Sequence, residues 1–539
     1  MSSRPMRDRS APDDTAPDDS APADRAEAPP VPLWLAVVLA ACAGGLLTLA
    51  FPQPAVWGLS FVAVAMLLVA LIGRRTWSAL LVGSVFGIVF FVLLVSWTGT
   101  YLGPIPWVAL GVLEGVLTGV GLIPVTLAYR WIPRAVRRPA VRALALAGTV
   151  GALWIGRELF VGTWPYGGFP WARIGLTMTD TNAAHLASWV GVSGLGFVVV
   201  AFVALVVEIV RDRPRAAPRP RLLPTLSSLL LLILLVAVPL FPTTPAGSMR
   251  IGAVQGNGPA GFFDEREPYA VIDAQISATR ELRGEDMDLL VWPEGGVDGD
   301  PFEGAALASA LNQVVRGVDA PLLGNAATGK GERFYNTSFL WPKDMTGTPS
   351  RSETQTHAKR HPVPFGEYVP DRAFYNAIVP DLIGLLQREY TPGDDAPLVR
   401  VGERTVGLAI CFDVIYDEVI REGIYGGAVV FVFQTNNADF RGTAENLQQL
   451  AIARMRAIET GRSVVNISTV GTSQIIRPDG STVSTVDADR PGVLLEDVEL
   501  RTGATGGVVV GPYLEQLLLW GGLLGVVVAG LSARRRRVG

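Results

Sequence analysis

Three side chains with different chemistry stand out in the second half of this chain, two at the ends of short apolar runs and one before a proline-rich stretch. Glu294 ends "LLVWPE", Lys359 precedes the proline-rich stretch "RHPVPFGEYVP", and Cys411 ends "TVGLAIC". A carboxylate, an ammonium and a thiol could together carry out nucleophilic catalysis, because a free thiol is mostly protonated at neutral pH and needs a base or a cation to act as a thiolate. The pattern predicts covalent catalysis through Cys411.

Each of these residues also has an ordinary structural explanation. An isolated glutamate is usually a helix cap or a surface charge, a lysine is usually a solvated cation, and a lone cysteine is most often a buried core thiol. However, only three of the 45 basic residues are lysines, so Lys359 is expected where a compact ammonium is needed rather than a guanidinium. Glu294, beside a tryptophan at a strand end, is well placed for a raised pKa and general-base work. Cys411 also occupies a strand end, where α/β domains present side chains into a cleft.

The stretch that holds these residues, about 248–505, has the pattern of an α/β domain. Short β-rich runs such as "MRIGAVQGN" and "AVVFVFQTNN" alternate with helical segments such as 445–460. Continuous apolar strands separated by helices indicate a buried sheet, and about 250 residues are enough to bury a sound core. The glycine spacing of "GAVQGNG" does not fit a dinucleotide site. With only three histidines and two cysteines in the chain, no metal site or other cofactor is expected.

The composition of the whole chain indicates a membrane protein. Apolar residues make up 49% of the 539 residues and charged residues only 17%, which is low for a soluble protein. Eight apolar segments each approach the ~20 residues that cross a bilayer as a helix. They lie at about 33–51, 55–72, 77–97, 105–128, 143–160, 184–210, 222–241 and 514–531.

Arginine placement predicts the orientation of these segments. Basic clusters follow the second, fourth, sixth and eighth segments, whereas the loops "PQP" at 52–54 and "TGTYLGPIP" at 98–106 carry no basic residue. By the positive-inside rule, both termini are cytoplasmic and the stretch between the seventh and eighth segments is extracytoplasmic. The clusters contain Arg74, Arg75, Arg130, Arg134, Arg137, Arg138, Arg142, Arg211, Arg213, Arg215, Arg219, Arg221, Arg534, Arg535, Arg536 and Arg537.

These patterns divide the chain into five parts. The first thirty residues are rich in Pro, Asp, Ala and Ser and contain no aromatic residue, so they cannot bury enough apolar surface to order themselves, and no signal-peptide cleavage site is expected. The predicted parts are a disordered cytoplasmic tail at 1–31, a seven-helix membrane region at 32–242, an extracytoplasmic catalytic domain at 248–505, an eighth membrane helix at 512–532 and a basic cytoplasmic tail at 533–539.

The order Glu, Lys, Cys on three strand ends of one α/β domain resembles the nitrilase, or carbon–nitrogen hydrolase, superfamily. That superfamily uses a Glu-Lys-Cys triad on an αββα sandwich. The stretches "WPEGG", "KRHPVPFGEYVP" and "GLAICFD" are similar to three catalytic motifs of one membrane branch, the apolipoprotein N-acyltransferases. The resemblance covers about 248–500, and the flanking apolar segments fit the same branch. It implies an eight-helix membrane bundle with an extracytoplasmic nitrilase-like αββα domain.

The resemblance also implies a role for each matching residue. Cys411 becomes the nucleophile, Glu294 the general base and Lys359 the stabiliser of the tetrahedral intermediate. Glu367 matches a further carboxylate, which in the family supports the triad and a moving loop.

In one place the sequence departs from the family pattern. Many relatives follow the nucleophile with Tyr-Glu, whereas this chain has Phe412 and Asp413, which keep the aromatic body and the negative charge. These two residues are expected to support the site or to bind substrate. A family aromatic in the loop after the "VQGN" strand has Phe262 and Phe263 as its counterparts.

The implied reaction has two substrates and proceeds through a thioester. A phospholipid donates its acyl chain to Cys411, and the α-amine of the N-terminal diacylglyceryl-cysteine of an apolipoprotein then accepts it, which is a ping-pong route. The protein is expected in the bacterial inner, or plasma, membrane, with lipid substrates and no nucleic-acid partner. Whether a lipid-linked sugar synthase accompanies it is unknown.

Two alternatives remain open from the sequence. One is a membrane-tethered nitrilase or amidase, in which water instead of an amine resolves the acyl-enzyme. The triad alone does not exclude it, although the eight segments and "FGEYVP" argue against it. The other is a transporter with a non-catalytic binding domain, which the order of the triad disfavours.

Three features outside the triad attract attention. The outer loop "RELFVGTWPYGGFPWARIG" at 157–175 suits the outer membrane interface, either as an aromatic anchor or as a substrate contact. Glu114 lies within the fourth apolar segment, where an ionisable group usually faces a cavity or a partner. Cys42, the other thiol, lies in an apolar run and is expected to be a packing residue.

Overall fold

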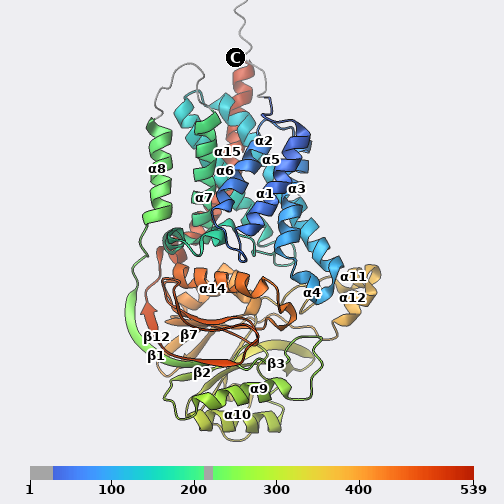
Figure 1. Ribbon diagram of the computed structural model, residues 1–539, viewed down its shortest axis with the longest axis vertical. Helices are drawn as coiled ribbons and strands as arrows, with labels where there is room; N and C mark the ends of the chain where they lie inside the picture. Colours follow the sequence, from blue (N-terminus) through green and yellow to red (C-terminus); the bar gives the residue numbers. More distant parts are fainter. Residues whose placement is uncertain (1–27, 212–221, 539) are drawn as a thin grey trace, which may run out of the picture.

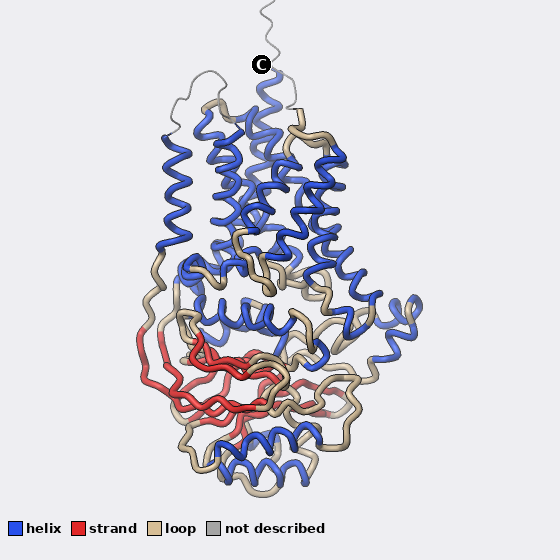
Figure 2. Tube along the Cα trace, viewed as in Figure 1, coloured by secondary structure: helices blue, strands red, loops and turns tan. Residues whose placement is uncertain are grey.

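The computed structural model describes residues 28–211 and 222–538 and shows a helical bundle standing on an α/β domain (Figure 1). All the strands gather in the α/β domain (Figure 2). The bundle is built from two distant parts of the sequence, because the last helix returns to it after the α/β domain (Figure 1). The predicted tail at 1–31 falls almost wholly outside the described residues. So do Arg213, Arg215, Arg219 and Arg221.

Every predicted apolar segment contains a helix. These helices, with one short helix between the third and fourth segments, are α1 (Leu33–Leu49), α2 (Leu59–Leu71), α3 (Thr76–Leu94), α4 (Thr98–Leu102), α5 (Pro104–Ala135), α6 (Pro139–Val161), α7 (Ala187–Arg211), α8 (Leu222–Ala237) and α15 (Gly506–Val538). Among the described residues, five helical stretches are long and apolar enough to cross a membrane: α3, α5, α6, the stretch Asn182–Arg211 that includes α7, and α15.

The expectation of eight full-length membrane helices is therefore met only in part. The helices α1, α2 and α8 are apolar but have 17, 13 and 16 residues. Helix α2 begins four residues later than the predicted segment. The first residue of that segment, Ala55, has a φ of +61°, which is outside the right-handed helical region, so the helix begins beyond it.

Other helices are longer than expected. Helix α5 continues beyond the predicted end near residue 128, and α15 continues through 533–538, where a separate basic tail was predicted. Arginine is a good helix former, and its charge is favourable near a helix C-terminus, so the basic run extends the helix. The predicted loop at 98–106 contains the short helix α4.

Helices α3 and α5 approach each other closely along a line of glycines. A Cβ atom added at Gly115 would lie 2.4 Å from the backbone nitrogen of Ile88, and one added at Gly87 would lie 2.7 Å from the carbonyl oxygen of Gly115. Small residues of this kind let membrane helices pack at short range. Cys42 lies off the face of α1 that buries Ala36, Ala40, Ala43 and Leu47, so it is exposed and the packing prediction for it is wrong.

The α/β domain contains two six-stranded sheets, with strand orders β12-β1-β2-β3-β4-β5 and β11-β10-β9-β8-β7-β6. The strands of the first sheet are β1 (Thr244–Gln255), β2 (Leu289–Val291), β3 (Leu322–Lys330), β4 (Arg333–Trp341), β5 (Gln355–Ala358) and β12 (Gly492–Thr502). Those of the second are β6 (Leu398–Val401), β7 (Arg404–Ile410), β8 (Val430–Thr435), β9 (Val464–Ser468), β10 (Ser473–Ile476) and β11 (Thr482–Val486).

The two sheets face each other across an apolar core and have helices on their outer faces. The shared core includes Ile251 and Leu289 from one sheet and Leu408 and Val432 from the other. Helices α9 (Ala270–Thr279) and α10 (Ala305–Val318) cover the first sheet. Helices α13 (Asp417–Tyr425) and α14 (Glu445–Thr460) cover the second, and α14 lies between that sheet and the bundle (Figure 1). The layer order is αββα, as the resemblance predicted.

Strand direction brings the three predicted catalytic residues to one edge of the sandwich. Strands β2 and β3 are parallel, and β5 runs in their direction because β4 is antiparallel to both of its neighbours. Glu294 follows β2 and Lys359 follows β5, so both lie beyond the same edge of the first sheet. Cys411 follows β7, whose parallel neighbour is β8 in the second sheet. Side chains at the carboxyl ends of such strands are presented into a cleft.

Candidate active site

Glu294 and Lys359 are buried and form a charged group with Glu367, which is partly exposed. The Lys359 ammonium lies 3.3 Å from Glu294 Oε1 and 2.8 Å from Glu367 Oε2. The side chain of Lys359 is 2% exposed, so the ammonium is almost completely removed from water. Backbone hydrogen bonds fix its position, since Lys359 N donates to the carbonyl of Asn336 at 2.8 Å and Gly393 N donates to the carbonyl of Lys359 at 2.8 Å.

Cys411 lies at a sharp change of direction between β7 and the turn that leads to α13. Its φ is +49°, in the left-handed region that a non-glycine residue adopts only where the surrounding structure enforces it. Its neighbours Ile410 and Phe412 are buried, whereas Cys411 is partly exposed. The turn therefore places Cys411, a partly exposed residue, beside the buried Glu294 and Lys359.

The charges around the thiol suit a base and a nucleophile that react together. Burial raises the pKa of Glu294, although the positive charge of Lys359 acts in the opposite direction. Burial also raises the pKa of Cys411 well above its ordinary value, the Glu294 charge adds to this, and Lys359 counteracts it. A raised carboxyl pKa suits general-base catalysis at neutral pH. These shifts favour the protonated thiol, and Glu294 is the carboxylate placed to accept its proton.

Lys359 remains a cation in spite of its burial. Burial alone lowers the pKa of a lysine, but the carboxylates of Glu294 and Glu367 outweigh this effect and hold the pKa of Lys359 well above its usual range. An ammonium has three donor hydrogens. Two contacts use the carboxylates, so one hydrogen remains for an anion that develops on a substrate.

Asn336, on β4, holds the two carboxylates of the site together. Its Nδ2 donates to Glu294 Oε1 at 2.7 Å and to Glu367 Oε1 at 3.2 Å, while its Oδ1 accepts from Asn325 Nδ2 at 2.9 Å. Asn336 was not predicted from the sequence. It stands beside Thr337 and Ser338 in "FYNTSFLW", where a further polar residue gives no signal of a role at the site.

Glu367 and Asp413 fasten the loop that carries Lys359. Glu367 Oε2 accepts a hydrogen bond from Val363 N at 2.7 Å, which closes the proline-rich loop on itself. The Asp413 carboxylate is fully buried and accepts hydrogen bonds from His361 N at 2.8 Å and Arg360 N at 3.1 Å. Asp413 therefore connects the turn that holds Cys411 to the loop that follows Lys359.

The aromatic ring of Phe412 contacts the outer loop at 157–175. Its centroid lies 6.0 Å from that of Phe169 and 6.4 Å from that of Trp171, with interplanar angles of 26° and 19°. The loop thus packs on the residue that follows Cys411. This contact favours a role for the loop at the site over a role as a simple membrane anchor. Phe262 and Phe263 are exposed and lie beside Tyr101 of α4, with centroid distances of 6.0 and 6.1 Å.

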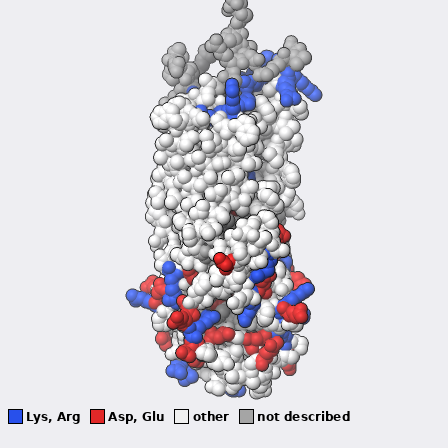
Figure 3. Space-filling model, turned by 90° about the vertical axis from the view of Figure 1, so that its right-hand side faces the viewer, with Lys and Arg blue, Asp and Glu red and all other residues white. Residues whose placement is uncertain are grey.

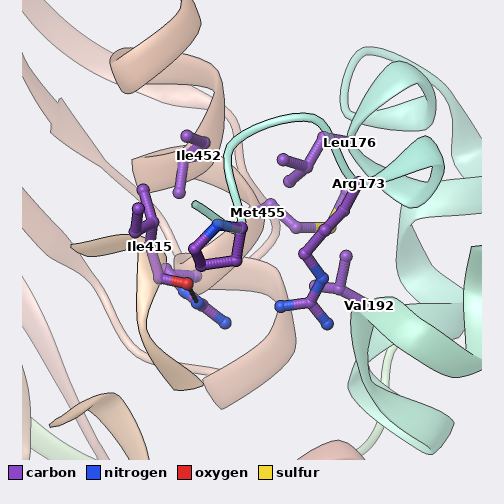
Figure 4. A pocket seen from close by; sticks show the side chains of 8 residues that line it. Arg173, Leu176, Val192, Ile415, Ile452 and Met455 are labelled. Carbon is purple, nitrogen blue, oxygen red and sulfur yellow. Dashed lines mark hydrogen bonds between the residues drawn. The ribbon is translucent and has the colours of Figure 1, made fainter. Parts of the chain in front are cut away.

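A small cavity lies between the outer loop and the catalytic domain (Figure 4). Its volume is about 10 Å³, which is room for about one water molecule and not for a lipid. Arg456, which lines it, donates hydrogen bonds to the carbonyl oxygens of Val414 and Ile415 at 2.9 and 2.8 Å and so braces the turn after Cys411. The lining residues are Pro170, Arg173, Leu176, Val192, Ile415, Ile452, Met455 and Arg456.

Glu114 lies inside the bundle. It is 2% exposed, and its Oε2 has no hydrogen-bond partner among the described residues. Within those same residues, no group of three or more His, Cys, Asp or Glu side chains is arranged to hold a metal ion.

Comparison with known proteins gives two family matches. Residues 43–205 match the family model Apolipoprotein N-acyltransferase N-terminal domain, and residues 250–505 match the model Carbon-nitrogen hydrolase. An apolipoprotein N-acyltransferase of Mycolicibacterium smegmatis is 29% identical over 533 residues, which cover 93% of this chain and 86% of the relative. One of Geobacter metallireducens is 29% identical over 537 residues, which cover 93% of this chain and 96% of the relative.

A solved structure is similar to the α/β domain only. A crystal structure of an amidase from Nesterenkonia sp. is 19% identical, with a TM-score of 0.34, and covers 47% of this chain and 92% of its own. The αββα layers described above stand on their own strand order and not on this likeness.

Proposed function

Because this chain belongs to the apolipoprotein N-acyltransferase family, a membrane branch of the carbon–nitrogen hydrolases, we propose that Cys411 carries the acyl group that the enzyme transfers to lipoproteins. The observation that carries this proposal is the contact between the side chains of Cys411 and Glu294, because Glu294 is buried and its carboxylate lies 3.3 Å from the Lys359 ammonium. A nucleophile beside its base and a cation is the arrangement that covalent acyl transfer requires.

The first half-reaction forms a thioester. Glu294 accepts the proton of the Cys411 thiol as the sulfur attacks the acyl carbonyl carbon of a phospholipid. The carbonyl electron pair moves to oxygen, and the remaining hydrogen of the Lys359 ammonium stabilises the oxyanion. The ester C–O bond then breaks, and the leaving oxygen takes the proton from Glu294. Lysophospholipid departs and Cys411 keeps the acyl chain.

The second half-reaction forms an amide. The α-amine of the diacylglyceryl-cysteine attacks the thioester carbon and gives a proton to Glu294, and Lys359 again faces the oxyanion. The C–S bond breaks, the sulfur leaves as a thiolate, and the thiolate regains its proton from Glu294. The product is an N-acylated lipoprotein, and the free enzyme is restored.

The distribution of charge supports a membrane position with the catalytic domain outside the cell. On the face that Figure 3 shows, basic side chains gather at the end of the bundle farthest from the α/β domain, and the surface between is nearly free of charge. This fits the positive-inside rule, with both termini cytoplasmic and eight membrane helices, of which α1, α2 and α8 are short. Both substrates keep their acyl chains in the bilayer, whereas extraction would lose ~0.8 kcal/mol per CH₂.

This arrangement assigns a role to each part of the chain. We propose that 32–242 and 512–532 hold the membrane helices, that 248–505 is the catalytic domain, and that Glu367, Phe412 and Asp413 support the triad. An amidase that uses water as acceptor is not favoured, because residues 43–205 match a domain of the acyltransferases and the curated relatives are acyltransferases.

A direct test is the intact mass of the purified enzyme. Incubation with phospholipid in detergent micelles, without acceptor, should add one acyl chain that hydroxylamine removes and that peptide mapping places on Cys411. Addition of a diacylglyceryl-cysteine peptide should discharge the acyl chain into an N-acylated peptide.

Two variants sharpen the test. Cys411→Ala should fold but neither release lysophospholipid nor carry an acyl chain. Cys411→Ser should acylate poorly, because a hydroxyl ionises far less readily than a thiol and its ester is less reactive toward an amine. An adduct on another residue, or N-acylation by Cys411→Ala, would refute the mechanism.

A further inference from the structure

The side chain of Gln449, on α14, points at the Cys411 thiol. Its amide nitrogen Nε2 lies 3.5 Å from Cys411 Sγ, within hydrogen-bonding range for sulfur. Gln449 is 2% exposed, and it comes from a helix that is separate from the loops carrying Glu294 and Lys359. The thiol therefore has a polar neighbour that the triad does not include.

The orientation of the Gln449 amide is set by Asn437. Asn437 Nδ2 donates to Glu445 Oε2 at 2.8 Å and to Gln449 Oε1 at 2.9 Å. Asn437 Oδ1 accepts from the hydroxyls of Ser468 at 2.6 Å and Thr435 at 3.3 Å. An amide nitrogen has two hydrogens, and Asn437 uses both of them. Gln449 must therefore turn its oxygen toward Asn437, which leaves its own N–H groups facing the sulfur.

Glu445 also accepts a hydrogen bond from Asn437, and its carboxyl adds less than a full negative charge near the thiol. Glu445 and Gln449 stand one turn apart on the same face of α14. Burial raises the pKa of Glu445 to about 8, while its hydrogen bond from Asn437 acts in the opposite direction. The carboxyl is thus mostly protonated at neutral pH. It anchors Asn437, and its proton limits the negative charge near Cys411.

We infer that Gln449 is a further catalytic residue of the acyl transfer, and that its amide N–H stabilises negative charge on the Cys411 sulfur. The sulfur carries that charge twice, when the thiolate attacks the donor ester and when it leaves the thioester. Gln449 transfers no proton in either step, so the bonds made and broken stay as described above. The inference rests on the proposed function, because it assigns a role in both half-reactions.

The surroundings explain why such a donor is needed. Burial disfavours a thiolate at this position, and Lys359, the cation that counteracts this effect, is already shared between two carboxylates. A hydrogen bond to a charged group changes an equilibrium by roughly 10-fold to 100-fold. A donor fixed in place before the reaction provides this stabilisation without rearrangement.

The inference is tested in a Cys42→Ala background, in which Cys411 is the only thiol. Gln449→Met keeps the length of the side chain but removes the donor, and Gln449→Glu keeps an acceptor for Asn437 while placing an acid beside the sulfur. Gln474→Met is the matched control, because Gln474 is also buried in the catalytic domain and accepts one hydrogen bond, from Thr482. Two rates are measured: alkylation of Cys411 by iodoacetamide without lipid, and single-turnover acylation by dipalmitoyl phospholipid in micelles.

Gln449→Met should slow both rates about 10-fold or more while the half-saturating donor concentration stays unchanged. Gln449→Glu should be slower still, and Gln474→Met should match the parent. Thermal unfolding shows whether each variant is folded. If either Gln449 variant is not, Gln449→Asn replaces it. The side chain of Gln449→Asn is one methylene shorter, which moves the donor away from the sulfur, so this variant should also slow both rates.

Three outcomes have distinct meanings. Parental rates in the Gln449 variants, or an equal loss in Gln474→Met, would overturn the inference and leave the proposed function intact. A change confined to the half-saturating donor concentration would also overturn it, because that would indicate a role in substrate binding. If the parent enzyme acquires no acyl group on Cys411, the proposed function fails, while the lipid-free alkylation still reports on Gln449.

Discussion

The guanidinium of Arg173 lies 2.6 Å from the carboxylate of Asp417, across the boundary between the membrane bundle and the α/β domain. Arg173 belongs to the outer loop between α6 and α7, and Asp417 begins α13, shortly after Cys411. Arg456 and Arg421 also contact Asp417, at 2.7 and 3.4 Å. One carboxylate therefore connects the outer loop to two helices of the α/β domain, close to the turn that holds Cys411.

The first prediction concerns removal of this carboxylate. Burial raises the pKa of Asp417, but Arg173, Arg456 and Arg421 outweigh this and hold it well below its usual value, so the residue is charged at neutral pH. Asp417→Asn would remove the carboxylate that the three arginines share. Arg173 and Arg421 would keep Glu515 as a partner. Arg456 would keep Glu459, so the loss should stay below the about 3–5 kcal/mol that a buried charge without any partner costs. We expect a lower free energy of unfolding, measured in detergent by denaturant titration, together with slower acylation of Cys411.

The matched control for this variant is Asp497→Asn. Asp497 pairs with Arg250 at 3.1 Å on the surface, where the two side chains are 64% and 37% exposed. Solvent screens such a pair, so its loss should cost less than about 1 kcal/mol. Equal stability of Asp417→Asn and Asp497→Asn would show that the buried network does not hold the two domains together.

The second prediction concerns the shape of the cation at position 359. Lys359 fits between Glu294 and Glu367 as a compact ammonium, and a guanidinium is larger and planar. Lys359→Arg should therefore slow acyl-enzyme formation almost as much as Lys359→Ala, by ~10²–10³ as for loss of an oxyanion donor. Single-turnover acylation measures the rate of acyl-enzyme formation.

The control is Lys343→Arg. Lys343 forms an exposed ion pair with Asp319, so this variant should behave as the unmodified enzyme. Near-normal turnover of Lys359→Arg would reduce Lys359 to a structural cation.

Sequence reasoning succeeded where a property depends on neighbours along the chain. An apolar run that ends in a polar residue identified the strand ends of Glu294 and Cys411, and a lysine in an arginine-rich protein identified Lys359. The parallel direction of the strands then brought these residues to one edge. The helix positions were predicted for the same reason, although α1, α2 and α8 proved shorter than a bilayer span.

Sequence reasoning failed where a role depends on contacts between distant segments. Asn336 and Gln449 are amides in unremarkable surroundings along the chain, and only the fold brings them to Glu294 and to Cys411. Asp413 was expected to support the site or to bind substrate, and the fold directs its carboxylate to the backbone of the lysine loop. No periodicity or spacing encodes such partners.

The third prediction concerns topology. The arginine clusters predict that the catalytic domain and the end of α15 lie on opposite sides of the membrane. An alkaline phosphatase reporter inserted near residue 300 should be active outside the cytoplasm, and a fluorescent reporter after Gly539 should fold in the cytoplasm. The loop at 52–54, labelled through an introduced cysteine, serves as an additional marker of the outer side. Finding both reporters on one side would overturn the membrane arrangement.

The last prediction concerns the pH dependence of stability and depends on Glu445. The folded protein holds the Glu445 proton up to about pH 8, whereas an unfolded chain releases it near pH 4.5. Between these values the folded state binds more protons than the unfolded state, so this residue makes the free energy of unfolding fall as pH rises, by at most about 1.4 kcal/mol per pH unit.

The variant Glu445→Gln keeps an acceptor for Asn437 but does not titrate. It should therefore lessen the decline of the free energy of unfolding between pH 4.5 and 8. Glu403→Gln, at an exposed position on a turn, is the control for the same substitution outside the buried site. Thermal unfolding across this pH range measures the effect, and parallel curves for the Glu445→Gln and unmodified enzymes would show that Glu445 is ionised in the folded protein at neutral pH.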